Sequence, residues 1–172
     1  MRYIYRQGNT LQYRQNGELL QIEPWGENSL RVRSTMMGNP EDTDYALLCG
    51  KSIQPEIETD EWTGSITNGK ITARLQVSDW SKRCRVRFYN QNGRLLLEEA
   101  EDGGSLNLDA REFKPVLGGD YKLTVRFASK EQEKIYGMGQ YQQDVLNMKN
   151  CTLELAHRNS QASVPFLLSD QG

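Results

Sequence analysis

Apolar and polar residues alternate along most of the chain, most clearly in residues 71–77. The same period of two recurs in residues 30–33, 85–88, 123–127 and 153–155. This alternation is typical of strands that turn one face to a core and the other to water. No segment repeats apolar residues at i, i+3, i+4 and i+7 over three turns, which is the pattern of an amphipathic helix. We therefore predict an all-β fold.

Turn signals separate the strand-like segments. Asn-Gly pairs favour the type I′ hairpin turn because both central residues need positive φ, and they occur at Asn16-Gly17, Asn68-Gly69 and Asn92-Gly93. Further turns are predicted at Gly38-Asn39-Pro40, Gly103-Gly104 and Gly118-Gly119-Asp120. The pattern predicts an antiparallel β-sandwich of about a dozen short strands.

The length of 172 residues suits one domain of ordinary size or two small ones. The composition changes near Ala128, where the regular succession of strand and turn ends. The charged run that follows, residues 129–134, is expected to be solvated and to form a turn or a single helical turn.

The charge balance gives no reason to expect nucleic acid or an anionic membrane as a partner. The chain has 21 basic and 23 acidic residues and a net charge of -2. No apolar run approaches the roughly 20 residues that cross a bilayer. The residues after Met1 do not form a signal-peptide core, so we expect a cytoplasmic protein.

Cysteine and histidine are too scarce for a metal site or a disulfide framework. The three cysteines, Cys49, Cys84 and Cys151, are scattered, and His157 is the only histidine. We predict no metal and no cofactor, with the thiols acting as small apolar residues in a reducing compartment.

No motif in the chain points to catalysis. Acidic clusters occur at residues 41–44, 56–61 and 98–102, and adjacent acids in turn-rich segments are expected to be solvated. A nucleophile motif is absent, and no helix is predicted after Gly137-Met138-Gly139 to hold a phosphate. We predict no catalytic residue.

The three tryptophans, Trp25, Trp62 and Trp80, all lie in or beside polar, turn-like sequence. Two interpretations stay open. An exposed ring can stack on a sugar, which would make the chain a free-standing carbohydrate-binding module using Trp62 or Trp80. Alternatively, the rings cover the edges of the core, as buried tryptophans usually do.

Three elements near the end of the chain are more specific. They are Tyr136-Gly-Met-Gly-Gln140, Arg158-Asn159 and Pro165-Phe-Leu-Leu-Ser169. In this order they resemble the Y-G-x-G-[EQ], R-[DN] and P-F-x-x-S elements that end the N-terminal β-sandwich of glycoside hydrolase family 31. This family contains retaining α-glucosidases and α-xylosidases.

The resemblance implies a galactose-mutarotase-like supersandwich over residues 1–172. In the family, a G-Y-G strand and a (β/α)8 barrel follow, and the barrel carries the nucleophile in a W-x-D-M-N-E-like motif. That motif does not occur here, and a barrel needs about 250 residues. The resemblance therefore implies a truncated, inactive N-terminal domain. Its partners would be the barrel in cis and an α-linked oligosaccharide.

The resemblance also implies roles for individual residues. Arg158 and Asn159, with His157 beside them, would bind substrate at the rim of the barrel. Asn159 stands where many members have aspartate, so a role that needs a carboxylate is in doubt. From the spacing alone, Arg158 could equally be a surface residue paired with Glu154.

Supporting roles are implied for the flanking strands. Gly137 and Gly139 permit a tight turn or a close backbone approach. Gln140 and Phe166 would support the loop or the domain interface, and Phe166 would end the loop and fill the core.

Docking on a barrel predicts an exposed apolar patch and weak self-association of the chain by itself. A third possibility is an enzyme of the sugar-mutarotase type. It would require a histidine and a carboxylate that converge in a cleft, and His157 is the single histidine.

Overall fold

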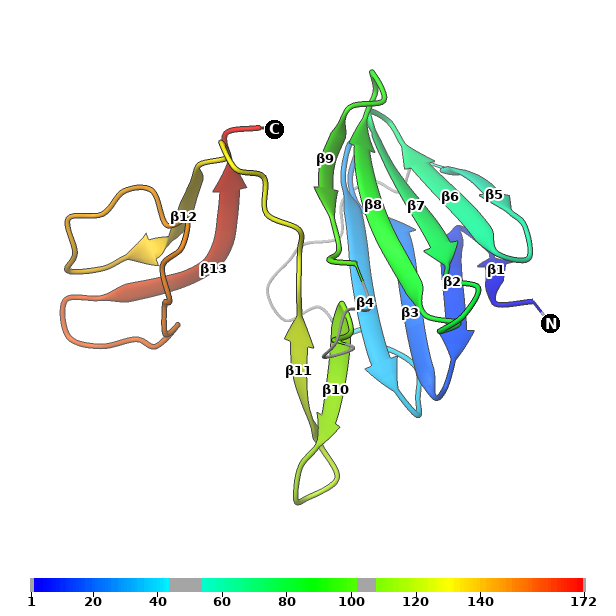
Figure 1. Ribbon diagram of the computed structural model, residues 1–172, viewed down its shortest axis with the longest axis horizontal. Coiled ribbons are helices and arrows are strands. Elements are labelled where there is room, and N and C mark those ends of the chain that lie inside the picture. The colour runs from blue at the N-terminus through cyan, green and yellow to red at the C-terminus, as the bar shows by residue number, and fades with distance from the viewer. Residues whose placement is uncertain (1, 44–53, 102–107, 172) are drawn as a thin grey trace. The chain divides into compact units, whose positions relative to one another are not determined.

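The computed structural model describes residues 2–43, 54–101 and 108–171 (Figure 1). These residues form thirteen strands, and none of them lies in a helix. The chain divides into two compact units, Met1–Ala128 and Ser129–Gly172. The boundary lies where the composition changes. The two units are described separately below as unit 1 and unit 2.

Unit 1 contains two antiparallel sheets made of sequential strands. The four-stranded sheet consists of β1 (Ile4–Gln7), β2 (Thr10–Gln15), β3 (Glu18–Pro24) and β4 (Leu30–Met36). The five-stranded sheet consists of β5 (Glu56–Thr59), β6 (Thr63–Asn68), β7 (Ile71–Val77), β8 (Cys84–Asn90) and β9 (Leu95–Glu98).

The two sheets share one hydrophobic core. Ile4, Leu11 and Ile22 contribute from the first sheet, and Ile66 and Leu75 from the second, all fully or almost fully buried. On β7, buried Ala73, Leu75 and Val77 alternate with exposed Arg74 and Gln76. The predicted all-β sandwich is confirmed, and period-two alternation is what produced it.

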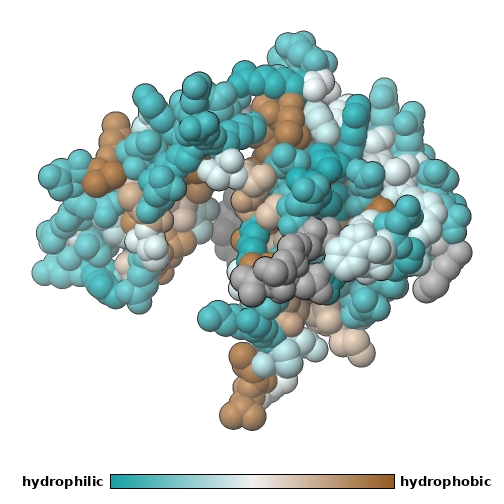
Figure 2. Space-filling model, in the orientation of Figure 1, coloured by the Kyte–Doolittle hydropathy of each residue, from teal (hydrophilic) through white to brown (hydrophobic). Residues whose placement is uncertain are grey.

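A third antiparallel pair, β10 (Arg111–Pro115) and β11 (Tyr121–Val125), is tied to the end of β9. The amides of Ala100 and Ala128 donate to Arg126 O and Glu98 O at 2.9 and 3.0 Å. Figure 2 shows hydrophobic residues at the free end of this hairpin, where Leu117 is fully exposed.

Unit 2 has one two-stranded sheet, formed by β12 (Ile135–Gln140) and β13 (Ala162–Ser169). The charged run before it forms a turn, as predicted, with Glu133 N–H donating to Lys130 O at 3.2 Å. The expectation that the run is solvated is wrong for Glu133, which is buried and accepts a hydrogen bond from Ser169 Oγ at 2.6 Å.

Only the first Asn-Gly pair has positive φ at both residues. Asn16 and Gly17 take φ of 50° and 84° in the two-residue turn between β2 and β3. Asn68 is instead the last residue of β6, and the turn consists of Gly69 and Lys70. In the β8–β9 loop only Gly93 has positive φ. The type I′ prediction is therefore wrong for the second and third pairs.

Within the described residues, no helix is long and apolar enough to cross a membrane.

Candidate functional site

The two glycines of the Y-G-x-G-Q element hold β12 close to β13. Gly137 and Gly139 have φ of 103° and 110° and flank an irregularity in the pairing of the two strands. A Cβ on Gly137 would overlap the carbonyl oxygen of Phe166, and one on Gly139 that of Ala162. Close backbone approach therefore requires glycine at both positions.

The side chain of Tyr141 connects β12 to β13 at the end of this strand pair. Its hydroxyl lies 3.0 Å from Met138 O and 3.0 Å from Ser163 Oγ, and Ser163 Oγ also lies 3.0 Å from Ala156 O. These bonds connect the glycine-containing strand to the segment that precedes the Arg158-Asn159 turn.

Arg158, Asn159 and His157 lie together on an exposed turn. Arg158 pairs with Gln161 across it, and Gln161 N–H donates to Arg158 O at 3.0 Å. The Arg158 guanidinium forms an ion pair with Glu154, and both side chains are mostly exposed. The local pairing of Arg158 that the spacing allowed is therefore present. His157 Nδ1 accepts a long hydrogen bond from Ser163 N–H at 3.4 Å.

Gln140 on β12 and Phe166 on β13 are both exposed. Phe166 is 62% exposed, so the expectation that it fills the core is wrong for this chain. The physical reason is that a two-stranded sheet has no second layer to enclose the side chain.

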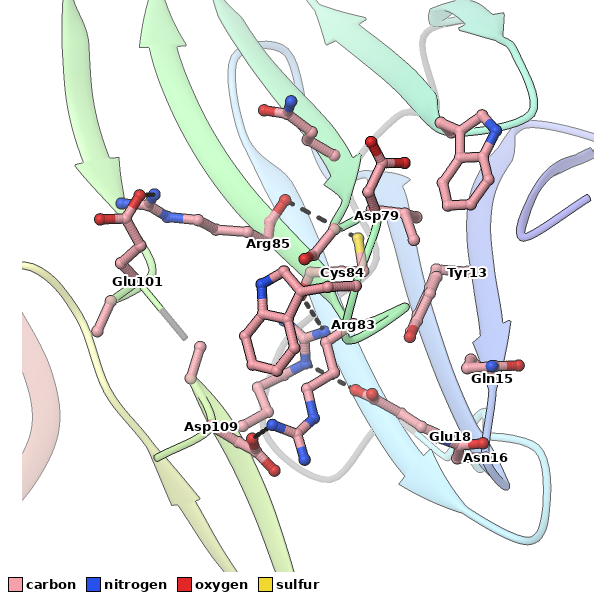
Figure 3. A pocket seen from close by; sticks show the side chains of 18 of the residues that line it. Tyr13, Gln15, Asn16, Glu18, Asp79, Arg83, Cys84, Arg85, Glu101 and Asp109 are labelled. Carbon is pink, nitrogen blue, oxygen red and sulfur yellow. Dashed lines mark hydrogen bonds and ion pairs between the residues drawn. The ribbon is translucent and has the colours of Figure 1, made fainter. Parts of the chain in front are cut away.

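A hollow of about 810 Å³ in unit 1 was not predicted from the sequence (Figure 3). It lies at the end of the sandwich where the β2–β3 and β7–β8 turns meet the start of β10. Its wall includes Asn16, Trp80, Arg83, Asp109 and Arg111. Arg83 and Asp109 point toward one another and form an ion pair.

Arg111 forms a buried ion-pair network in the wall of the hollow. Its Nε lies 2.6 Å from Glu18 Oε1, and its Nη1 contacts the carboxylate of Glu99. Nη2 donates to Cys84 O at 3.0 Å, and Glu99 Oε2 accepts Val86 N–H at 2.9 Å. Burial alone would lower the pKa of Arg111, but the Glu99 and Glu18 carboxylates outweigh it and raise the pKa above its usual value.

This network corrects the expectation that the acidic cluster at 98–102 is solvated. Glu99 is buried, and its carboxylate is part of this ion-pair network.

The cysteines have different environments. Cys84 is buried as expected, and burial raises the pKa of its thiol to about 12. Cys151, in contrast, is exposed and does not act as a small apolar core residue. Cys49, Asp44 and Asp102 lie outside the described residues.

The three tryptophans have different environments. The ring of Trp62 lies 5.1 Å from that of Tyr3 and packs against the core. Trp25 is half-buried, with the Arg31 guanidinium 4.0 Å from its ring centroid. Trp80 is 65% exposed. The interpretation that the rings cover the edge of the core is therefore correct for Trp62. Of the three rings, only that of Trp80 is mostly exposed to water.

In the part of the chain that the structure describes, no group of three His, Cys, Asp or Glu side chains could hold a metal ion.

Comparison with known proteins finds a relative that aligns with the whole of this chain. No family model matches the chain. An uncharacterized family 31 glucosidase of Pseudescherichia vulneris is 44% identical over 189 residues, covering 100% of this chain and 35% of that protein. The crystal structure of a family 31 α-xylosidase from a soil metagenome, complexed with xylose, has a TM-score of 0.87 and 45% identity. The chain is homologous to family 31 glycoside hydrolases.

The match to the family 31 α-xylosidase covers 98% of this chain and 27% of that one. A family 31 α-xylosidase structure from Xanthomonas citri, with a TM-score of 0.75 and 23% identity over 99% of this chain, shows the same fold. The chain thus spans about a third of the curated relative's length. The family 31 resemblance read from the Tyr136, Arg158 and Pro165 elements is confirmed. The roles of the individual residues stay predictions.

Proposed function

We propose that the chain is a non-catalytic N-terminal domain of a longer retaining α-glycosidase and that it packs on the catalytic barrel of that enzyme. One observation carries the proposal: the family 31 relative aligns with all of this chain, whereas the chain spans only 35% of that relative. In an enzyme of that length, most of the protein lies outside this domain and can pack against it in cis.

The exposed apolar side chains of unit 2 support this docking role. Val164, Phe166, Leu167 and Leu168 on β13 are all exposed, and Leu167 and Leu168 are consecutive in its regularly paired part and therefore on opposite faces. A two-stranded sheet is marginally stable in water. A sheet with apolar residues on both faces needs further cover, and the proposed barrel would supply it.

A second apolar face lies on the hairpin of unit 1. Tyr121, Leu123 and Val125 occupy alternate positions of β11 and are exposed, while Lys122 and Thr124 occupy the positions between them. Such a face on one strand is typical of an interface rather than of a solvated edge.

We further propose that the Arg158-Asn159 turn, with His157, contributes to the substrate site. Because Arg158 and its partner Glu154 are both mostly exposed, their ion pair is weak, and the guanidinium can exchange Glu154 for a sugar hydroxyl. The Asn159 amide can donate to and accept from hydroxyl groups. Since His157 Nδ1 accepts from Ser163 N–H, the neutral ring carries its proton on Nε2.

The substrate proposed is an α-linked glucoside or xyloside. The test compares the 172-residue chain with the complete protein encoded by its gene, on p-nitrophenyl α-glucoside and α-xyloside. We expect activity in the complete protein and none in the chain. Equal activity in both, or no reading frame beyond Gly172, would overturn the proposal.

The loop is tested in the complete protein with Arg158→Ala and Glu154→Ala. Both variants break the same ion pair. If Arg158 binds substrate, only Arg158→Ala raises KM, by about tenfold for one lost charge-assisted hydrogen bond, with kcat less affected. The same change in both variants would assign Arg158 to local structure alone.

A further inference from the structure

We propose that the hollow at Trp80 in unit 1 is a binding site for a neutral saccharide. The proposal uses residues of unit 1 only, and it does not depend on the docking role of unit 2. It goes beyond the domain role proposed above by assigning the sandwich a ligand of its own.

The hollow has the size and position of a small-ligand site. Its volume of about 810 Å³ falls within the range of roughly 300–1,000 Å³ typical of such sites. Its wall includes the β2–β3 turn with Gln15 and Asn16, the β7–β8 loop with Ser78, Asp79, Trp80 and Arg83, and the start of β10 with Arg111. Figure 3 shows Gln15, Asn16, Asp79, Arg83 and Asp109 around it.

The charges of the wall favour a neutral ligand. Four arginines and four acidic residues line the hollow, namely Arg83, Arg85, Arg87, Arg111, Glu18, Asp79, Glu101 and Asp109. Each of the four arginines forms an ion pair with an acid. A phosphate would have to displace these carboxylates, and a metal cation at one of the paired acids would have to displace its guanidinium group. A polyhydroxylated neutral molecule can accept from and donate to both without breaking either pair.

Uncharged polar side chains add donors and acceptors between the ion pairs. Gln15, Asn16, Gln76 and Ser78 all line the hollow. Their amide and hydroxyl groups match the vicinal hydroxyls of a sugar, which also donate and accept.

Trp80 supplies the apolar surface that a pyranose ring requires. One face of a pyranose presents mainly C–H bonds, and it packs on an aromatic ring while the hydroxyls point outward. Trp62 and Trp80 both line the hollow, but the Trp62 ring packs against the core, whereas Trp80 is 65% exposed. Covering such a large apolar ring is favourable, and a sugar face can do so.

The loop that carries Trp80 is held in place before any ligand binds. Ser78 N–H donates to Arg83 O at 2.9 Å, and Lys82 N–H donates to Ser78 O at 3.0 Å. Lys82 O accepts from the buried Tyr13 hydroxyl at 2.8 Å, while Lys82 Nζ lies 4.4 Å from the centroid of the Trp62 ring. A ring presented by a fixed loop costs little ordering entropy when a ligand binds.

The test titrates the 172-residue chain with xylose, maltotriose and isomaltotriose, and with inorganic phosphate as the anionic comparison. Isothermal calorimetry measures affinity, and saturation-transfer NMR detects weak contact with the sugar protons. We expect saturable binding of at least one saccharide and none of phosphate. A folded chain that binds none of the three saccharides, or that binds phosphate in competition with them, would overturn the proposal.

Variants locate the binding. Trp80→Ala removes the ring and is expected to weaken saccharide binding at least tenfold, while Trp80→Phe keeps a smaller ring and weakens it less. The control is Leu117→Ala, which removes a fully exposed apolar side chain that does not line the hollow. Circular dichroism confirms that each variant is folded. Wild-type affinity in Trp80→Ala, or an equal loss in Leu117→Ala, would refute the site.

Discussion

Arg111 on β10 and Glu99 just after β9 form an ion pair in which each side chain is only 5–6% exposed. The same guanidinium contacts Glu18 on β3, so one residue connects the hairpin to both sheets of the sandwich. Because Glu99 also accepts an amide from β8, neither charge can leave the network without leaving a buried partner behind.

Arg111→Leu is therefore expected to lower the free energy of unfolding by about 3–5 kcal/mol, since it leaves the buried Glu99 and the partly buried Glu18 without their cation. Urea denaturation measures the change. Arg158→Leu is the matched control, because its ion pair with Glu154 is mostly exposed, and it should cost about 0–1 kcal/mol. Similar losses in the two variants would contradict the structural role of Arg111.

Gly139 is expected to tolerate alanine far worse than Gly118, although their φ values are nearly equal at 110° and 104°. A Cβ on Gly118 meets nothing within 4 Å, whereas one on Gly139 overlaps Ala162 O. Gly118→Ala should cost about 1–2 kcal/mol from backbone strain alone. Gly139→Ala should abolish protection of the β12–β13 amides in hydrogen exchange. Unchanged protection would mean that the β12–β13 pair accommodates a Cβ at Gly139, which would contradict the prediction.

Hydrophobic alternation was sufficient to predict the sandwich because a period of two fixes which side of a strand is buried. Local turn chemistry was less informative. Asn16-Gly17 forms the turn that its sequence favours, but Asn68 lies one position earlier, at the end of a strand, where its buried side chain donates to Gly26 O and Ser29 O. That role depends on contacts with residues about forty positions away in the sequence, and the sequence around Asn68 does not indicate them.

Asn68→Ala should consequently lower the free energy of unfolding by about 1–3 kcal/mol, because the buried Asn68 side chain loses two partly buried hydrogen bonds. Asn92→Ala is the control. Asn92 lies on the exposed β8–β9 loop, and its substitution should change stability by about 0.5 kcal/mol or less. Thermal unfolding of both variants checks the difference, and equal shifts would indicate that the Asn68 amide bonds contribute little.

The two candidate sites differ in how far the sequence reveals them. The β12–β13 unit is contiguous, so its glycines, Arg158 and Phe166 could be identified from short motifs. The residues that line the hollow are spread along the chain between Tyr13 and Phe113, and its ion pairs join acids and arginines that are far apart in the sequence. From the sequence alone, Glu99 is indistinguishable from its solvated neighbours, because its burial depends on Arg111.

Stability should fall as the pH rises from about 9 to 12, and Cys84 is one cause. Burial raises the pKa of its thiol from 9.0 to about 12. In this range the unfolded thiol has lost its proton while the folded one retains it, so the unfolded state is favoured. Cys84→Ala should flatten the decline by at most about 1.4 kcal/mol per pH unit. Cys151→Ala, which removes an exposed thiol, should leave the slope unchanged.

The 172-residue chain is expected to self-associate through β13 when no catalytic domain covers it. Phe166 and Leu168 lie two residues apart on β13, and both are more than half exposed. Replacing both with serine should weaken association at least tenfold, which corresponds to about 1.4 kcal/mol. The control Leu117→Ser removes a fully exposed apolar residue from the hairpin tip of unit 1 and should have a smaller effect. Sedimentation velocity over a concentration series measures all three proteins. A wild-type chain that stays monomeric throughout would show that β13 does not need cover, and the docking role proposed for unit 2 would lose its main support.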